Sequence, residues 1–405
     1  MIKAVLLDLD DTLIQTRTNE FFAAYVSMLG KYGGTLTSTQ GFGKLVLRTY
    51  AEVLAQTDPT ARLYDRFLPR IASSLHMDAA KLDDMFQAFY RDCYPDLKSW
   101  IHPQPETRSL LDFLFQNDIQ VVVATNPGLP IAAIGQRMAW GGIPQEDYPF
   151  ELVTSIEEMH FGKPQASYYE EIMVRLNLDP GEAIMAGDDW ENDIIGAATA
   201  GLCTYWITEN GSTPPDPNVP ISGYGTYHEL AKKIERGWLQ TLSAPPPSRD
   251  TLLARLLAFP SAIDVLRRAY RAEIMECRPA ETEWSARDII CHLRDHEAEE
   301  DRRRLERILS EQNPFLSANY DPWANVSHYA QVSADAAFLE FTALRMKTVE
   351  WLSALPPEAW SRPARYSIFG PTHFEEMVRF TTEHDLTHLR QMLAAIDHAL
   401  ITCGP

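Results

Sequence analysis

The chain of 405 residues is long for a single hydrophobic core, so two domains are the default expectation. Its composition, 45% hydrophobic and 23% charged, is that of a globular protein rather than of a disordered or fibrous one. The net charge of −20 argues against a general affinity for nucleic acid or for anionic membranes.

The sequence contains no uncharged apolar run of the length that a membrane-spanning helix needs, and it does not begin with a signal peptide. We therefore expect a cytoplasmic protein that binds neither membrane nor nucleic acid. The cysteines are scattered without a CxxC pair, which predicts reduced thiols at all five: Cys93, Cys203, Cys277, Cys291 and Cys403.

An apolar run at residues 2–7 predicts a buried parallel strand, and three carboxylates follow it at once: Asp8, Asp10 and Asp11. Ligands of open α/β sheets sit beyond the carboxyl ends of the strands, so we expect Asp8 and Asp10 to face a site. Two such carboxylates can divide the work of phosphoryl transfer, with a hard cation between them. Taken alone, the same residues suit a turn or a helix N-cap equally well.

Residues 15–100 show helical periodicity and no good strand. Phe21, Phe22, Tyr25 and Leu29 mark one apolar helix face in this segment. A helical insertion directly after the first strand would lie over the carboxyl end of that strand. We expect it to cover the site.

From residue 101 to residue 240 strands and helices alternate, with strands near 119–124, 151–154, 183–186 and 203–207. This repeat predicts an α/β, Rossmann-like parallel sheet with helices on both faces. Polar side chains follow the strand ends: Thr125 and Asn126, then Lys163, then Asp188, Asp189 and Asp193.

A proline-rich stretch at 241–248 is the best linker candidate. Beyond it, helical patterns at about 249–277, 285–311, 334–355 and 373–400 predict an all-α four-helix bundle. We thus expect an α/β domain at 1–240, with its core at 1–14 and 101–240 and its helical cap at 15–100, and a bundle at 249–405.

The polar clusters at the N-terminal strand ends resemble the motifs of the haloacid dehalogenase-like (HAD) hydrolase superfamily. Asp8-Leu9-Asp10-Asp11-Thr12 is similar to the DxDxT first motif, Thr125 to the second, Lys163 to the third, and Gly187-Asp188 through Asp193 to the fourth. The resemblance covers residues 1–236 and implies an α-helical cap, which selects small soluble substrates.

The resemblance also implies a role for each matching residue. Asp8 would be the nucleophile that forms an aspartyl-phosphate, and Asp10 would protonate the leaving alcohol and then activate water. Thr125 and Lys163 would bind the phosphoryl oxygens, with Asn126 beside them in the substrate site. Asp8, the backbone carbonyl of Asp10 and Asp188 would hold Mg²⁺.

Two further acidic residues, Asp189 and Asp193, follow Asp188 in the fourth motif. Asp193 would either face the metal or support a residue that does, and Asp189 suits a helix N-cap as well as an acidic rim. Within the superfamily an acid at the position of Asp10 is typical of phosphohydrolases and phosphomutases, whereas dehalogenases lack it. The resemblance therefore implies a phosphatase.

The C-terminal half carries two histidine pairs. His384 and His388 lie four residues apart, hence on one helical face, and His292 and His296 lie on an earlier helix. Two histidines from one helix and one from a facing helix suit a three-nitrogen metal site with an open position. Paired histidines on a charged helix are nevertheless more often surface residues than ligands.

Residues 284–297 and 383–391 resemble the DinB-like four-helix-bundle superfamily, over about residues 250–400. That resemblance implies a metal triad of His292, His384 and His388, with His296 as the second choice for the first ligand. Members of the superfamily bind zinc or nickel, and some are transferases that use low-molecular-weight thiols. Others have no known activity.

The sequence therefore predicts a Mg²⁺-dependent phosphatase that acts on a small phosphorylated metabolite, joined to a bundle that binds Zn²⁺ or Ni²⁺. Two alternatives stay open for the bundle. It could carry thiol-dependent transferase chemistry, or it could be a non-enzymatic binding module through which the chain forms a homodimer.

Overall fold

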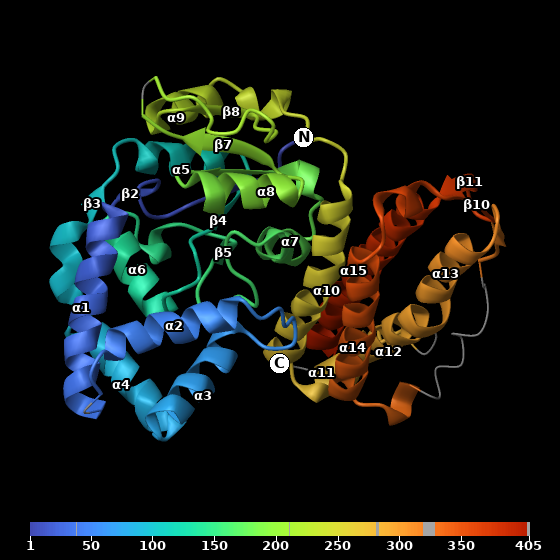
Figure 1. Cartoon of the computed structure of the whole chain (residues 1–405), viewed down its shortest axis with the longest axis horizontal. Helices are drawn as coiled ribbons and strands as arrows, with labels where there is room; N and C mark the ends of the chain where they lie inside the picture. The colour runs from blue at the N-terminus through green and yellow to red at the C-terminus, as the bar shows by residue number, and fades with distance from the viewer. Residues whose placement is uncertain (38, 210, 281–282, 319–328, 403–405) are drawn as a thin grey trace. The chain divides into compact units, whose positions relative to one another are not determined.

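The computed structural model describes residues 1–37, 39–209, 211–280, 283–318 and 329–402. The chain divides into two compact units, Met1–Pro246 and Pro247–Pro405 (Figure 1). None of the helices in these described ranges is long and apolar enough to cross a membrane.

The N-terminal unit is built on a six-stranded parallel sheet in the order β5-β4-β1-β6-β7-β8. At the centre, Leu7 of β1 pairs with Val123 of β4 on one side and with Ala186 of β6 on the other. This register brings the carboxyl ends of β1, β4 and β6 side by side. The strands are β1 (Ala4–Leu7), β4 (Gln120–Val123), β5 (Leu152–Val153), β6 (Ala183–Gly187), β7 (Cys203–Ile207) and β8 (Gly223–Gly225).

Amphipathic helices connect these strands and pack on the sheet. Leu110, Leu111 and Leu114 of α5, for example, are fully buried against it. The predicted α/β parallel sheet is confirmed, although β8 was missed because its Gly-Tyr-Gly sequence has no apolar run. The helices are α5 (Thr107–Gln116), α6 (Ile131–Trp140), α7 (Ala166–Arg175), α8 (Gly196–Thr199) and α9 (Tyr227–Glu235).

The helical insertion after β1 is present (Figure 1), and its described residues form four α-helices and the 3-10 helix Tyr94–Trp100. Its two connections to the sheet domain pair with each other as a short antiparallel ladder of β2 (Ile14–Gln15) and β3 (His102–Pro103). Two-residue strands leave no periodic pattern, so the sequence did not predict this ladder. The helices are α1 (Thr18–Thr37), α2 (Phe42–Leu54), α3 (Leu63–Leu75) and α4 (Ala79–Asp92).

The C-terminal unit is a helical bundle, as predicted, although it is not entirely α-helical. Its first predicted helix is divided in two, because Tyr270 and Arg271 adopt extended backbone conformations between α10 and α11. The second continues from α12 into α13 through a π-helical turn at Glu297–Asp301. The helices are α10 (Arg249–Ala269), α11 (Ala272–Glu276), α12 (Ala286–His296), α13 (Arg302–Ser310), α14 (Ala334–Ser353) and α15 (Phe374–Thr402).

The bundle also carries a small sheet that the sequence did not predict. It consists of β9 (Phe315–Leu316), β10 (Pro363–Tyr366) and β11 (Gly370–His373), in the order β11-β10-β9. Strands this short, two of them containing proline, give no clear strand signal.

The cysteine prediction is correct in part. Cys93, Cys203 and Cys291 are free thiols. Cys277 is disulfide-bonded, so the expectation of reduced cysteines is wrong at that position. Cys403 lies outside the described residues.

Candidate active site and candidate metal centre

One cavity of about 630 Å³ in the N-terminal unit is lined by every N-terminal residue that the sequence singled out for the site. The residues come from the ends of β1, β4 and β6 and from the loop before α7: Asp8, Asp10, Thr125, Asn126, Lys163, Asp188 and Asp193. The parallel register of the central strands explains this convergence, because their carboxyl ends meet at one edge of the sheet.

Three carboxylates cluster around a single lysine. One oxygen each from Asp8, Asp188 and Asp193 lies within 4.8 Å of the others. Lys163 Nζ donates to Asp8 Oδ1 at 2.7 Å and also donates to Asp193 Oδ1. The lysine is only 2% exposed, so its charge is committed to these two carboxylates.

The cluster has more negative charge than one lysine neutralises. Burial raises the pKa of Asp188 to about 7, and the charges of Asp193 and Asp11 add to this effect. Burial also raises the pKa of Asp8 well above its usual range, against the opposing effect of Lys163. A divalent cation would relieve this repulsion, and a donor set made only of oxygens suits Mg²⁺. The residues present therefore fit a magnesium ion.

Asp10 is held on both oxygens by residues outside the strand. Its Oδ1 accepts a hydrogen bond of 2.8 Å from Thr16 Oγ1, and its Oδ2 accepts one from the guanidinium of Arg137 on α6. Arg137 is 1% exposed, and the Asp10 carboxylate raises its pKa although burial alone would lower it. The carboxylate is thus fixed in position at the cavity wall.

Sequence reasoning missed Arg137. A signal was present, because Arg137 falls on the same helical face as Ala133, Ile134 and Met138, all of them buried. An arginine on the buried face of a helix requires an anionic partner. Asp10 is that partner.

Thr125 is buried just after the end of β4, and its backbone carbonyl accepts two hydrogen bonds from side chains. Its carbonyl oxygen accepts hydrogen bonds from Thr154 Oγ1 at 2.7 Å and from the Tyr168 hydroxyl at 2.8 Å. Asn126, the next residue, is exposed and accepts a 3.4 Å hydrogen bond from the Tyr50 hydroxyl of α2. The Thr125 side chain therefore stands on a rigid support beside Asp8.

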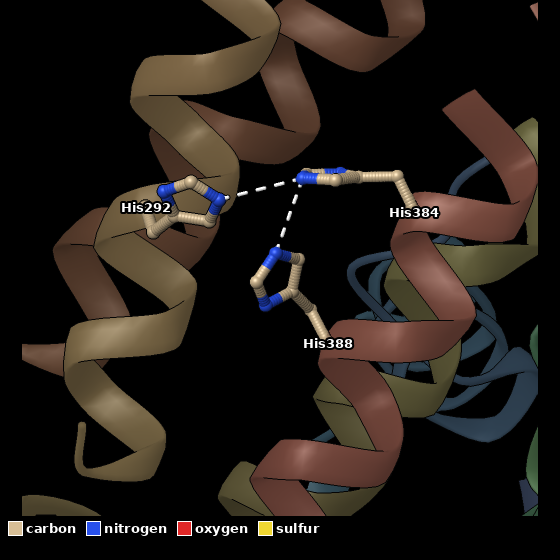
Figure 2. Close-up of side chains that lie close together, drawn as sticks. All are labelled: His292, His384 and His388. Carbon is tan, nitrogen blue, oxygen red and sulfur yellow. Dashed lines mark hydrogen bonds between the residues drawn. The ribbon is translucent and has the colours of Figure 1, made fainter. Parts of the chain in front are cut away.

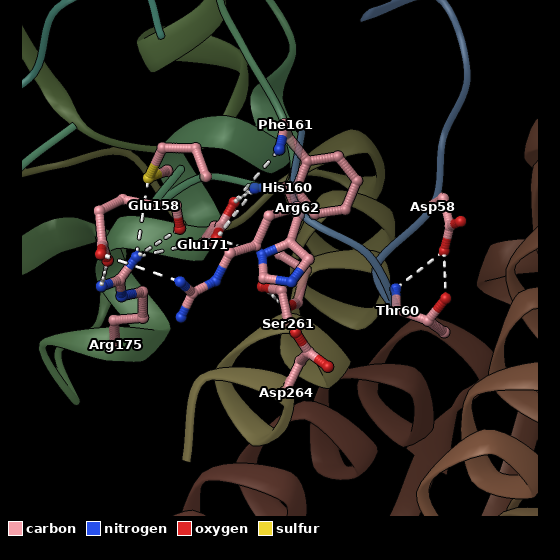
Figure 3. A network of polar contacts seen from close by, with 12 residues as sticks. Asp58, Thr60, Arg62, Glu158, His160, Phe161, Glu171, Arg175, Ser261 and Asp264 are labelled. Atoms are coloured by element: carbon pink, nitrogen blue, oxygen red, sulfur yellow. Dashed lines mark hydrogen bonds and ion pairs between the residues drawn. The ribbon is translucent and has the colours of Figure 1, made fainter. Parts of the chain in front are cut away.

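The loop that presents Lys163 is anchored by a buried glutamate of α7 (Figure 3). Glu171 accepts hydrogen bonds from the backbone N–H of His160, at 3.1 Å, and from that of Phe161, at 3.3 Å, and lies 2.8 Å from His160 Nδ1. Nearby, Arg175 donates to Glu158 at 3.0 Å. These contacts fix the chain a few residues before Lys163.

Asp189 acts as a helix N-cap, one of the two roles left open by the sequence. Its Oδ1 accepts from the backbone N–H groups of Glu191 and Asn192, at 3.0 and 2.9 Å. These bonds satisfy donors at the start of the Trp190–Ile195 helical turn. Asp193 lies in this helical turn, which places its carboxylate near Asp8 and Asp188.

Three histidines of the C-terminal unit converge (Figure 2). One ring nitrogen each from His292 on α12 and from His384 and His388 on α15 lies within 4.8 Å of the others. His384 Nε2 is 3.5 Å from His292 Nε2 and 3.1 Å from His388 Nε2. These are the three residues that the sequence singled out as ligands.

Burial keeps this histidine cluster uncharged. It lowers the pKa of His292 to about 2, that of His384 to about 3 and that of His388 to about 4. His388 Nδ1 lies 3.0 Å from Gln391 Oε1, which orients the ring with Nε2 toward the other two histidines. Neutral imidazoles with converging nitrogens suit a zinc-type or nickel-type cation.

His296, the second choice as ligand, lies beside the cluster and has another partner. Its Nδ1 is 2.9 Å from Asp301 Oδ2, and its ring stacks on that of His384 with 4.2 Å between centroids. Behind the cluster, the buried Arg345 of α14 pairs with Asp385, the residue after His384. Arg345 also donates to Glu297 at 2.8 Å, so the helices that carry the histidines are linked through one arginine.

Two family models match the chain. Residues 2–201 match the haloacid dehalogenase-like hydrolases, and residues 265–392 match the DinB superfamily. Residues 2–201 thus form a HAD-like hydrolase domain, and residues 265–392 lie in a DinB-superfamily domain. Both family predictions are therefore confirmed, and the chain is an enzyme.

Curated relatives match the HAD-like part. Glyceraldehyde 3-phosphate phosphatase of Methanothermobacter thermautotrophicus is 27% identical over 208 residues, which are 51% of this chain and 86% of the relative. Pyrimidine 5'-nucleotidase YjjG of Escherichia coli is 27% identical over 165 residues, which are 40% of this chain and 67% of the relative.

Solved structures resemble each half separately. A HAD phosphatase from Thermococcus onnurineus aligns at 19% identity and a TM-score of 0.39, over 57% of this chain and 98% of that one. YfiT from Bacillus subtilis, a four-helix bundle described as a probable metal-dependent hydrolase, aligns at 15% identity and a TM-score of 0.33, over 37% of this chain and 90% of that one.

Proposed function

We propose that the N-terminal unit is a Mg²⁺-dependent phosphatase that hydrolyses a small phosphomonoester through an aspartyl-phosphate on Asp8. The observation that carries the proposal is the position of Asp8, which shares one cavity with a buried lysine and with a second, separately held aspartate. A phosphate ester repels an anionic nucleophile, so nearby positive charge is required before a carboxylate can attack.

Asp8 attacks the phosphorus atom, and the ester P–O bond breaks. The leaving oxygen takes a proton from the protonated form of Asp10. The resulting carboxylate, the form that Thr16 and Arg137 hold, is then the base that removes a proton from the attacking water. Water cleaves the aspartyl-phosphate, and inorganic phosphate and free Asp8 are the products. Lys163 and Thr125 hold the phosphoryl oxygens during both steps.

The magnesium ion would be held by Asp8 and Asp188, with the Asp10 carbonyl and Asp193 completing the set. When bound, it supplies positive charge to the phosphoryl group that the single lysine does not provide. Side chains of the protein supply the other functions. Lys163 orients the Asp8 carboxylate, and Arg137 and Thr16 hold the Asp10 carboxylate in position. Asn126 faces the substrate from the cavity wall.

The predicted domain boundaries support a division of labour. In this proposal the phosphatase spans 1–240, with the helical segment at 15–100 as its cap, and a linker at 241–248 leads to the bundle at 249–405. The similarity to a glyceraldehyde 3-phosphate phosphatase and to a pyrimidine 5'-nucleotidase supports a small phosphorylated metabolite as the substrate.

For the bundle we propose a second divalent metal, zinc or nickel, on His292, His384 and His388. Three protein nitrogens leave a fourth coordination position open, which favours a catalytic centre over a closed structural site. Thiol-dependent transfer is one chemistry that such a centre supports. A non-enzymatic, self-associating module is the competing proposal, and the metal measurement in the Discussion separates the two.

The test of the phosphatase is phosphate release by the full chain from an aryl phosphate and a metabolite panel, with Mg²⁺ and with excess chelator. Asp8→Asn keeps the shape of the side chain and removes its nucleophilic charge, so we expect a loss of about 10³-fold or more. Asp118→Asn, at an exposed loop position, is the matched control and should keep full activity. Equal activity of wild type and Asp8→Asn would refute the mechanism.

A further inference from the structure

A second cavity of the N-terminal unit, of about 740 Å³, lies between the cap segment and the loops after β4 and β5. This volume is in the range of sites that take drug-sized ligands, and a three-carbon phosphate would leave most of it empty. Seven aromatic side chains line it, among them Tyr25, Tyr50, Tyr64 and Tyr90. The N-terminal motifs do not account for this lining.

The aromatic cavity continues into the catalytic one. Phe22, Asn126 and Leu129 line both. The Tyr50 hydroxyl donates to Asn126 Oδ1 at 3.4 Å, and Asn126 directly follows Thr125 of the phosphoryl site. A substrate with its phosphoryl group at Asp8 can therefore extend its leaving group among the aromatic rings.

The charges around the aromatic cavity argue against a second phosphate. Asp83 and Glu157 are the carboxylates of its described lining, and Arg91 is the one cation among those residues. Arg91 is bound to Asp92, with its Nη2 2.7 Å from Asp92 Oδ2, and is largely exposed. A bisphosphate or a pyrophosphate would place an anion against these carboxylates without a free cation to neutralise it.

Two carboxylates, Asp83 and Glu157, are the strongest acceptors in the lining. Asp83 accepts from the Tyr64 hydroxyl and from Gln87 Nε2, the latter at 2.8 Å. Glu157 Oε2 accepts from the backbone N–H of Ile131 at 3.0 Å, and a carboxylate oxygen has capacity for further donors. A ligand with N–H or O–H donors would match these acceptors.

We propose, on the basis of the phosphatase function above, that the substrate is a phosphomonoester whose leaving group carries a planar aromatic ring system with N–H donors and no second phosphate. Aromatic rings pack edge-to-face or offset-stacked on other rings, which the tyrosines of the cavity allow. The charge of the lining and its volume exclude triose phosphates, sugar bisphosphates and pyrophosphate as preferred substrates.

The experiment compares three substrates of the full-length enzyme in Mg²⁺. Cytidine 5'-monophosphate and ribose 5-phosphate share the same primary leaving alcohol and differ in the aromatic ring, and ribulose 1,5-bisphosphate adds the second phosphate. We expect kcat/KM for the cytidine nucleotide to exceed that of both others by at least about tenfold, the effect expected of one well-filled pocket. An equal or higher value for either sugar phosphate overturns the proposal.

Variants of Tyr50 test the aromatic contact itself. Tyr50→Phe keeps the ring and should keep the preference for cytidine 5'-monophosphate over ribose 5-phosphate, whereas Tyr50→Leu should reduce that preference about fivefold or more. Arg48→Leu, on the same helix at an exposed position that does not line the cavity, should change kcat/KM for neither cytidine 5'-monophosphate nor ribose 5-phosphate. A Tyr50→Leu enzyme with the full preference overturns the proposal.

The outcomes separate this inference from the phosphatase proposal. If no substrate releases phosphate, or if Asp8→Asn is as active as wild type, the phosphatase proposal fails. If phosphate release depends on Asp8 but sugar phosphates are preferred, the phosphatase proposal stands and the aromatic-substrate inference is wrong.

Discussion

The guanidinium of Arg137 donates a hydrogen bond to the carboxylate of Asp10, across 127 residues of sequence. Both side chains are nearly buried, with 1% of the arginine and 11% of the aspartate side chain exposed. Arg137 also lies over the ring of Phe21 on the cap segment, 5.7 Å from its centroid. Arg137 of α6 thus contacts both the proposed acid and the helical insertion.

The first prediction concerns this ion pair. Arg137→Met should lower the free energy of unfolding by about 3 kcal/mol, because it leaves a nearly buried carboxylate without its cationic partner. It should also lower kcat about tenfold with little change in KM, since Asp10 loses its fixed position. Urea denaturation of the full chain and steady-state kinetics measure the two effects.

The control is a double variant. Asp10→Asn in the Arg137→Met background removes the unpaired charge and should restore at least half of the lost stability without restoring activity. Arg137→Lys keeps the positive charge and should fall between wild type and Arg137→Met in kcat. If the double variant is no more stable than Arg137→Met, the loss of stability comes from the lost packing of the Arg137 side chain and not from the broken ion pair.

A second prediction concerns Thr16, whose hydroxyl donates to Asp10 Oδ1 at 2.8 Å in a buried environment. Thr16→Val preserves the shape and removes this bond to a charged group, so we expect a loss of about 1.5–3 kcal/mol in stability. The free energy of unfolding, measured in urea, gives the value. The backbone N–H of Thr16, which donates to Asp11, is unaffected.

Thr12→Val is the matched control for Thr16→Val. Thr12 is also fully buried, but its hydroxyl has no hydrogen-bond partner among the described residues. The same substitution there removes an unsatisfied polar atom, so stability should stay equal or rise. Equal losses from both variants would show that the Thr16 bond contributes nothing specific.

The N-terminal site could be predicted because each of its motif residues directly follows a strand or a short connection. Asp8, Thr125 and Asp188 need only a parallel register to meet, and that register follows from alternating strands and helices. Arg137 and Thr16 were missed because their role depends on a tertiary contact with one carboxylate, Asp10, and they belong to no motif. Thr16 has no local sequence signal, and the signal of Arg137 is its position on the apolar face of α6.

In the bundle, helix periodicity predicted the long helices and the facing histidines. The break at Tyr270 and the small sheet of β9, β10 and β11 were missed, because these depend on tertiary contacts and not on local periodicity. His296 was a reasonable second candidate, since it lies one helical turn from His292. Its pairing with Asp301 depends on the π-helical turn, which spacing along a regular helix does not predict.

The third prediction concerns Lys163, which binds both Asp8 and Asp193. Lys163→Met removes the one buried cation of the acidic cluster, so Mg²⁺ should bind several-fold more tightly while kcat falls about 10²-fold or more. Calorimetric titration of Mg²⁺ into the full chain gives the affinity, and phosphate release gives the rate. Lys163→Arg keeps the charge and should leave the Mg²⁺ affinity near that of wild type. Weaker Mg²⁺ binding by Lys163→Met would contradict the proposed metal position.

The fourth prediction concerns the histidine cluster of the bundle. The full chain, stripped with chelator and reloaded with Zn²⁺ or Ni²⁺, should retain one ion per chain after gel filtration. His384→Ala removes the nitrogen that lies nearest the other two, at 3.5 and 3.1 Å, so stoichiometric metal should be lost. Elemental analysis of the purified protein measures the content.

Two variants control for this loss. Glu383→Ala changes the exposed neighbour of His384 and should keep the metal, and His296→Ala should keep it as well, because Nδ1 of His296 is engaged with Asp301 outside the triad. Phosphate release should be the same in all three variants, since the acidic cluster lies in the other unit. Loss of metal in His296→Ala but not in His384→Ala would move the site to His296, and no metal in wild type would favour the self-associating module.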